Sequence, residues 1–202
     1  PSQYGENDDF YFSTIPERLR KKGRSVAIAS ISQFGGHQAY FKTYFKPTKV
    51  PRVFLSESLN LNSEFNFRIR LRNESKRIRI LQKSRQIDLE RNILYEGSIK
   101  VLGGSAQTNL RLYDQITSLV RETNAKIIIT PYEGHAYERI VFSAARQINK
   151  NIRCLSYQHT GVFRLSNAIR NSLSGIYNPD LIITSGISGK NDLEKAPALR
   201  DI

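Results

Sequence analysis

The chain has 202 residues, of which 39% are hydrophobic and 10% aromatic, and this is enough apolar material for a packed core and excludes wholesale disorder. No apolar run approaches the roughly 18 residues that span a bilayer, no signal peptide is visible, and the single Cys154 excludes an internal disulfide framework, so we expect a cytoplasmic protein. The formal net charge of +13 favours an anionic partner, which is nucleic acid, an anionic membrane surface, or an acidic or phosphorylated substrate.

The N-terminal part of the chain predicts a helix and two strands. Apolar residues recur at helical spacing over residues 9–22, and Gly23 follows as a stop signal. Residues 24–31 and 50–58 have the composition of strands. The loop between them carries Gly35-Gly36-His37, which either turns the chain or binds an acceptor.

Residues 66–91 hold nearly half of the net charge. Nine Lys or Arg side chains against three acidic ones leave +6 in this segment. Although FRIRLR alternates as a strand does, residues 76–95 suit a long basic helix better, so we expect a helical insertion over residues 62–95. This insertion is either a solvated basic helix or a surface for an anionic partner.

From Leu110 onward, helical segments alternate with apolar strands. We expect helices over residues 110–123 and 138–148, and buried strands over residues 126–130, 152–157 and 180–184. This alternation predicts an α/β domain with a doubly wound parallel sheet and helices on both faces. We expect the domain to cover residues 1–184, and residues 185–202 to begin a linker or helix towards a further domain, as in a piece of a larger protein.

Polar segments follow the last three predicted strands. They are residues 131–139, 158–163 and 185–190. In open α/β sheets, ligands bind beyond the carboxyl ends of the strands, where helix N-termini present free N–H groups. We therefore expect the three segments to meet on one rim of the sheet.

The first of these segments, PYEGHAYER, divides into two parts. Glu133 is suited to act as a general base or to hold a sugar hydroxyl, and His135 to polarise or orient a substrate. The glycine between them lets backbone approach a ligand. Glu138 and Arg139 instead suit the first turn of a helix, where a carboxylate meets the positive end of the helix dipole.

The other two segments offer hydrogen-bonding groups. In QHTGVF, His159 either grips a ligand or is tied into the hydrogen bonds of its own loop. In SGISGK the spacing departs from that of a P-loop, so a phosphate cradle is only weakly indicated. The three histidines and one cysteine lie too far apart for a metal signature, and no GxSxG motif indicates an esterase.

Taken together, several of these motifs resemble a known group of proteins. YEGHAYERIVFSAAR, then a strand and YQHTGVF, then NPDLIITSG and a helix, resemble bacterial surface-carbohydrate (polysaccharide and O-antigen) biosynthesis proteins with a glycosyltransferase-like GT-B architecture. The resemblance covers roughly residues 105–195 and extends more weakly to residues 9–31. It implies that this chain is one half of a GT-B enzyme, the N-terminal, Rossmann-like, acceptor-side domain.

The resemblance also implies a reaction and a set of site residues. A sugar would pass from a nucleotide-sugar co-substrate, held mostly by a C-terminal domain, to a surface-polysaccharide or lipid-linked acceptor, with no cofactor or metal ion. Glu133 would be the general base and His159 the second candidate. By the resemblance, His135 and Gln158 would line the cleft beside them. The strand-end positions add Thr160, Gly161, Ser185 and Gly186 as further groups that would bind substrate.

The basic segment gains a role in this interpretation, and two other interpretations stay open. Residues 66–91 would meet phospholipid headgroups, or a lipid-linked acceptor that carries phosphate, at the inner membrane face. The first alternative is a nucleic-acid-binding α/β module, although aromatic residues are not interleaved with the basic run. The second is a non-catalytic domain that binds a sugar or a protein partner.

Overall fold

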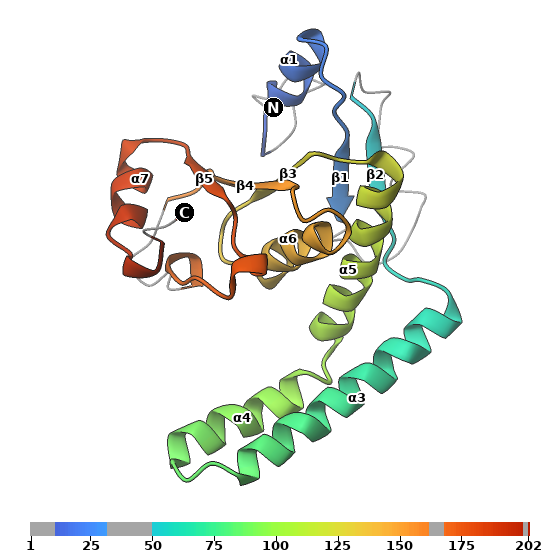
Figure 1. Cartoon of the computed structure of the whole chain (residues 1–202), viewed down its shortest axis with the longest axis vertical. Helices are drawn as coiled ribbons and strands as arrows, with labels where there is room; N and C mark the ends of the chain where they lie inside the picture. The colour runs from blue at the N-terminus through green and yellow to red at the C-terminus, as the bar shows by residue number, and fades with distance from the viewer. Residues whose placement is uncertain (1–10, 32–49, 162–167, 200–201) are drawn as a thin grey trace, which may run out of the picture. The chain divides into compact units, whose positions relative to one another are not determined.

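The computed structural model describes residues 11–31, 50–161, 168–199 and 202 (Figure 1). The chain divides into two compact units, residues 1–57 and residues 58–202. The predicted division at residue 184 stays a prediction, and the loop with Gly35-Gly36-His37 lies outside the described residues.

The described residues of the first unit form one helix and a pair of parallel strands. Helix α1 (Ile15–Lys21) carries Pro16 in its first turn, and the chain leaves it through Gly23, whose φ of +75° suits a glycine. Strands β1 (Ile28–Ile31) and β2 (Arg52–Leu55) pair in parallel. The described helix and both strands are shorter than predicted, because only these residues have helical or ladder hydrogen bonds.

The second unit begins with a hairpin of two helices. Helix α3 (Leu61–Lys83) starts at Asn60, whose side chain accepts a hydrogen bond from the Ser63 N–H at 2.9 Å. Helix α4 (Asp88–Lys100) follows after a short connection. The prediction of one continuous helix over residues 76–95 is therefore wrong, because the chain turns between Ser84 and Ile87 and packs the two helices against each other.

The rest of the second unit alternates helices and parallel strands. Helix α5 (Gly104–Thr123) ends at Asn124, which has a left-handed backbone. The elements that follow are β3 (Ile127–Pro131), α6 (Ala136–Ile148), β4 (Arg153–Gln158), the 3₁₀ helices η1 (Ala168–Arg170) and η2 (Gly175–Tyr177), β5 (Leu181–Thr184), α7 (Ile187–Glu194) and the 3₁₀ helix η3 (Pro197–Leu199).

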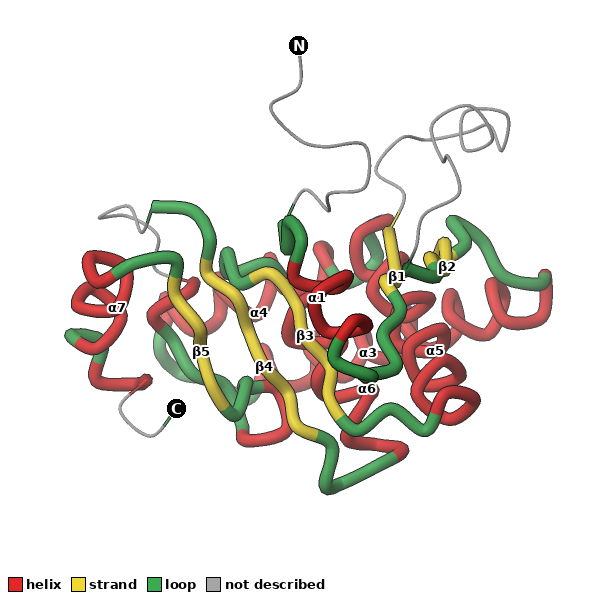
Figure 2. Tube along the Cα trace, turned by 90° about the horizontal axis from the view of Figure 1, so that it is seen from above, coloured by secondary structure: helices red, strands yellow, loops and turns green. Residues whose placement is uncertain are grey.

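The three described strands of this unit form one parallel sheet in the order β3-β4-β5 (Figure 2). Parallel α/β structure is thus confirmed, with the described strands divided between a two-stranded and a three-stranded sheet. The expectation of fully buried strands is wrong for one face of the larger sheet. Ile127 of β3 is 55% exposed and Leu181 of β5 is 45% exposed, because side chains alternate between a covered and an open face along each strand.

Helix α6 packs against β3 on the covered side. It buries Val141, Phe142, Ala144 and Ala145, and it packs against α5, which buries Leu112, Ile116 and Val120. Ile140 of α6 is only partly buried. Among the described residues, no helix is long and apolar enough to cross a bilayer.

Candidate functional site

The loop that follows β3 is held in place by a buried carboxylate. Glu138, in the first turn of α6, is fully buried, and its carboxylate accepts hydrogen bonds from three successive backbone N–H groups. The donors are Glu133 at 2.8 Å, Gly134 at 2.9 Å and His135 at 3.1 Å. Burial raises the pKa of Glu138, although the three N–H donors act in the opposite direction. Glu138 therefore serves its helix, as predicted, and also fixes the backbone of the loop.

Gly134 permits the sharp turn of this loop. Its φ of +92° lies in the region that side-chain-bearing residues rarely adopt. A Cβ atom at this position would also lie 2.9 Å from the Ala168 Cβ and 3.0 Å from the Ile169 nitrogen. The turn directs Glu133 and His135, which flank the glycine, to the rim of the sheet.

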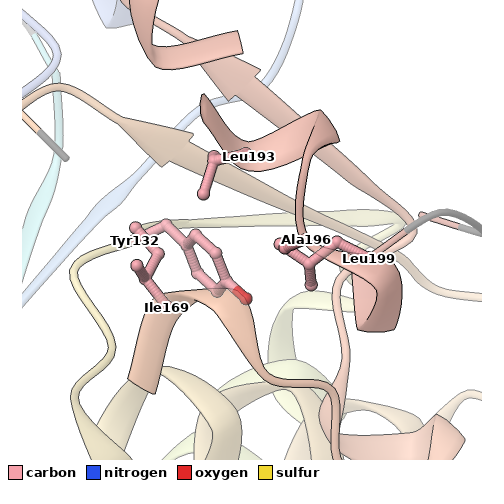
Figure 3. Packing of buried hydrophobic residues seen from close by; sticks show 5 residues of the cluster. All are labelled: Tyr132, Ile169, Leu193, Ala196 and Leu199. Carbon is pink, nitrogen blue, oxygen red and sulfur yellow. The ribbon is translucent and has the colours of Figure 1, made fainter. Parts of the chain in front are cut away.

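Tyr132 anchors the start of the same loop in the core. Its ring is fully buried in a cluster with Ile169, Leu193, Ala196 and Leu199, which join η1, α7 and η3 to the end of β3 (Figure 3). Burial raises the pKa of its phenol, whose oxygen accepts a hydrogen bond from Arg139 at 2.7 Å. The residue before Glu133 is thereby held rigidly.

Arg139 has a wider role than the predicted one of a helix start. It is 6% exposed, and besides Tyr132 it donates to the backbone oxygen of Asn171 at 2.7 Å and to the Asn178 side chain at 2.8 Å. It thus ties α6 to the segment between β4 and β5. Its position gave no separate signal in the sequence, because a first-turn arginine is usually solvated.

The predicted catalytic residues come together at the rim. The carboxylate of Glu133 lies between two imidazoles, with its Oε1 3.2 Å from the His159 Nε2 and its Oε2 3.3 Å from the His135 Nε2. The Glu133 and His159 side chains are 24% and 18% exposed, whereas His135 is 56% exposed. Residues from the ends of β3 and β4, separated by 26 positions in the sequence, thus form one cluster.

The ring of His159 is further oriented by the strand that precedes it. It stacks on Tyr157, with ring centroids 6.0 Å apart and an interplanar angle of 28°. His135 stacks in a similar way on Tyr137, at 5.3 Å. Both imidazoles are therefore held by an aromatic neighbour on one side and by Glu133 on the other.

A cavity of about 360 Å³ lies beside this cluster, at the carboxyl ends of β4 and β5. Its wall contains six residues of the predicted site. The two strand ends are joined by a hydrogen bond from the Ser185 N–H to the backbone oxygen of Gln158 at 2.9 Å. The lining residues are Gln158, His159, Thr160, Gly161, Ser185, Gly186, Ser188, Gly189 and Asp192. Of these, sequence reasoning missed Asp192, although it lies one helical turn beyond Ser188 and so on the same side of α7.

Gln158 is the most unusual of the lining residues. Its side chain is fully buried, and neither amide atom has a hydrogen-bond partner among the described residues. The amide lies against the first turn of α7, because a Cβ on Gly189 would be 2.6 Å from the Gln158 Oε1. A buried amide without a partner costs about 1–3 kcal/mol, so its presence beside a cavity indicates a ligand or water that completes its bonds.

The first turn of α7 adds further donors to the same cavity. The helix begins after Gly186, which gives no side-chain cap, so its first N–H groups have no partner within the helix. The described lining includes no Lys or Arg, and it includes the carboxylate of Asp192. This mixture of amide, hydroxyl, imidazole and carboxylate groups suits a ligand with many hydroxyls better than a free phosphate.

The described part of the chain contains no group of three or more His, Cys, Asp or Glu side chains placed to hold a metal ion. Comparisons with protein-family models, with curated proteins and with solved structures found no match to this chain.

Proposed function

We propose that this chain is the acceptor-binding part of a sugar transferase, with a Rossmann-like, doubly wound fold that forms one half of a GT-B architecture. The observation that carries the proposal is the Glu133 carboxylate held between two imidazoles at the rim of a polar cavity. Such a cavity offers both donors and acceptors to the hydroxyls of a sugar. The motif resemblance gives the reaction class.

Glu133 is the proposed general base. A carboxylate has about four lone-pair positions, so two imidazole donors leave room for a substrate hydroxyl. Glu133 would take the proton of the acceptor hydroxyl while that oxygen bonds to the anomeric carbon of the donor sugar. The bond between this carbon and the phosphate oxygen of the donor would break, and the nucleotide would leave with the electron pair.

The two histidines have separate proposed roles. His159 lines the cavity and orients the carboxylate, and it is positioned to bind the acceptor beside the reacting hydroxyl. His135 is more exposed and holds the second carboxylate oxygen. The nucleotide-sugar is a co-substrate in this proposal, and the basic charge of the chain is consistent with a cytoplasmic enzyme that works next to anionic lipid.

The test is sugar transfer by the full natural protein. Nucleotide release would be measured with uridine-, guanosine- and thymidine-diphosphate sugars, each with polyprenyl-phosphate sugars as acceptors. We expect Glu133→Gln to lower kcat by at least about 100-fold, in the usual range for a general base. The matched control is Glu122→Gln, at an exposed position of α5. Equal turnover by Glu133→Gln and the unchanged protein would remove Glu133 from the reaction.

The non-catalytic alternative is separated by a binding measurement. Chemical shifts of the His159 imidazole would be followed during titration with a panel of methyl glycosides. Saturable shifts without turnover for any donor and acceptor pair would favour a sugar-binding domain that has no transferase activity. If neither shifts nor turnover occur, the sugar proposal is wrong.

A further inference from the structure

The α3–α4 hairpin leaves its outer surface uncovered. On its inner side, Phe67, Leu71 and Ser75 of α3 are buried, and the Ser75 hydroxyl donates to the backbone oxygen of Ser98 in α4 at 2.7 Å. A bidentate pair between Arg111 and Glu64, with N–O distances of 2.6 and 2.8 Å, ties α3 to α5. The inner side is therefore a formed interface, and the outer side is available to a partner.

The outer side exposes large aliphatic side chains near the turn of the hairpin. Ile80 is 71% exposed, Ile87 59% and Leu89 68%. We call residues 76–91 the hairpin end. Three large aliphatic side chains thus face solvent within a span of ten positions, and exposed apolar groups rimmed by polar residues are typical of interaction sites.

The hairpin end is also strongly basic. It contains six Lys or Arg residues and two acidic ones, which leaves +4. Arg85 and Arg91 lie 3.8 Å and 3.5 Å from acidic neighbours within the segment. Lys76, Arg79 and Lys83 are exposed, and in the described part of the chain no acidic side chain pairs with them. Cationic and aliphatic side chains thus share one exposed end.

This combination distinguishes between the possible partners. A second copy of the hairpin end would bring +4 against +4, which opposes self-association. Nucleic acid would match the charge, but the segment has no aromatic residue on which a base could stack. An anionic bilayer accepts both kinds of side chain, because aliphatic groups enter the boundary of the acyl chains while Lys and Arg stay among the phosphates.

We propose that the hairpin end, residues 76–91, docks the protein on the surface of an anionic lipid bilayer. Ile80, Ile87 and Leu89 enter the headgroup region, and Lys76, Arg79 and Lys83 contact lipid phosphates. This proposal does not depend on sugar transfer, since it uses residues outside the cavity and is measured without a sugar substrate.

Vesicle co-sedimentation of the full chain tests the charge requirement. We expect binding to phosphatidylcholine vesicles in which about a third of the lipid is phosphatidylglycerol, and much weaker binding to pure phosphatidylcholine or at about 0.5 M salt. The triple variant Lys76→Gln/Arg79→Gln/Lys83→Gln should lower the partition coefficient by about 100-fold, at about 1 kcal/mol for each cation. The control triple variant Arg121→Gln/Lys126→Gln/Lys150→Gln removes the same charge from exposed positions elsewhere and should lower it less than about threefold.

A tryptophan reporter tests the aliphatic requirement. The chain has no natural tryptophan, so Ile87→Trp provides a single emission signal. We expect a blue shift with anionic vesicles and quenching by brominated lipid, and neither with Ile176→Trp, at a position 52% exposed in η2. Ile80→Ser/Leu89→Ser should lower the partition coefficient by at least about tenfold, since two aliphatic side chains are lost from the interface.

Several outcomes would overturn the proposal. The first is the absence of binding to anionic vesicles. The second is an equal decrease of the partition coefficient in the two triple-charge variants. The third is an Ile87→Trp emission maximum that does not shift when the protein is bound to vesicles. If the protein stays in the supernatant with anionic vesicles but forms dimers, the hairpin end is a self-association surface. If it stays in the supernatant but binds RNA at low salt, the hairpin end is a nucleic-acid surface. All substituted positions are exposed, and circular dichroism would confirm that each variant is folded.

Discussion

The carboxylate of Glu138 accepts a hydrogen bond from the backbone N–H of Glu133 at 2.8 Å, so a buried helix residue determines where the candidate base lies. Two further N–H groups, of Gly134 and His135, bind the same carboxylate. The site therefore depends on a residue that does not itself face the cavity.

Glu138→Gln should weaken both the loop and the fold. The glutamine amide has only one acceptor oxygen, so its NH₂ group would face at least one backbone N–H that now donates to the carboxylate. We expect a loss of about 2 kcal/mol in the free energy of unfolding, measured by urea denaturation. Glu122→Gln, at an exposed position of α5, should change it by less than about 0.5 kcal/mol. A stable Glu138→Gln protein would show that the loop does not rely on this carboxylate.

Gly134→Ala should be strongly unfavourable, whereas a matched glycine should tolerate the same change. At Gly134 the φ of +92° and the close approach to Ala168 act together, and we expect a loss of about 2 kcal/mol or more. A Cβ added to Gly97, inside α4, would meet no other described atom within 4 Å, so Gly97→Ala should gain up to about 1 kcal/mol from helix propensity. Thermal unfolding of the two variants provides the comparison, and equal effects would contradict it.

Glu64 should make stability dependent on acid pH. Its hydrogen bonds to Arg111 lower its pKa from 4.5 to about 2, so the folded state binds fewer protons than the unfolded state between these values. This contribution to stability is fully present above pH 4.5 and is lost as the pH falls towards about 2. Glu64→Gln should therefore lose about 2 kcal/mol at neutral pH and lose much less near pH 2.

A second ion pair, between Glu74 and Arg77, serves as the control for this pH dependence. Glu74 binds Arg77 at 2.6 Å, and the two side chains are 40% and 70% exposed. Hydrogen bonding to Arg77 also lowers the pKa of Glu74, but solvent screens such a pair. We expect Glu74→Gln to change the free energy of unfolding by less than about 0.5 kcal/mol, both at neutral and at acid pH. A larger change would place the acid-sensitive group in this pair.

Gln158→Leu should stabilise the protein while impairing ligand binding. Leucine has a similar size and removes a buried amide that has no partner among the described residues. We expect a gain of about 1–2 kcal/mol in the free energy of unfolding without ligand, measured by urea denaturation. The chemical-shift changes of the His159 imidazole on titration with methyl glycosides should at the same time become smaller. A loss of stability would instead mean that the amide has a structural role.

The sequence by itself determined the alternation of helices and parallel strands after Leu110, because apolar periodicity reflects burial that every such strand and helix requires. It also identified the strand-end segments, since the residues that follow parallel strands lie at the edge of the sheet where ligands bind in α/β proteins. It identified residues 62–95 as helical, but it missed the turn between Ser84 and Ile87, because the contact of Ser75 with Ser98 that pairs the two helices has no local signal in the sequence.

Only the tertiary structure decided which polar residues meet. His159 approaches Glu133 because β3 and β4 are adjacent and in register, with Pro131 opposite Tyr157, and no local pattern encodes that distance. The burial and pairing of Arg139 likewise depend on the segment between β4 and β5, which supplies Asn171 and Asn178 as its acceptors. Local sequence specifies which elements form, whereas contacts between distant segments specify the environment of each charge, because solvation and pairing are properties of the packed chain.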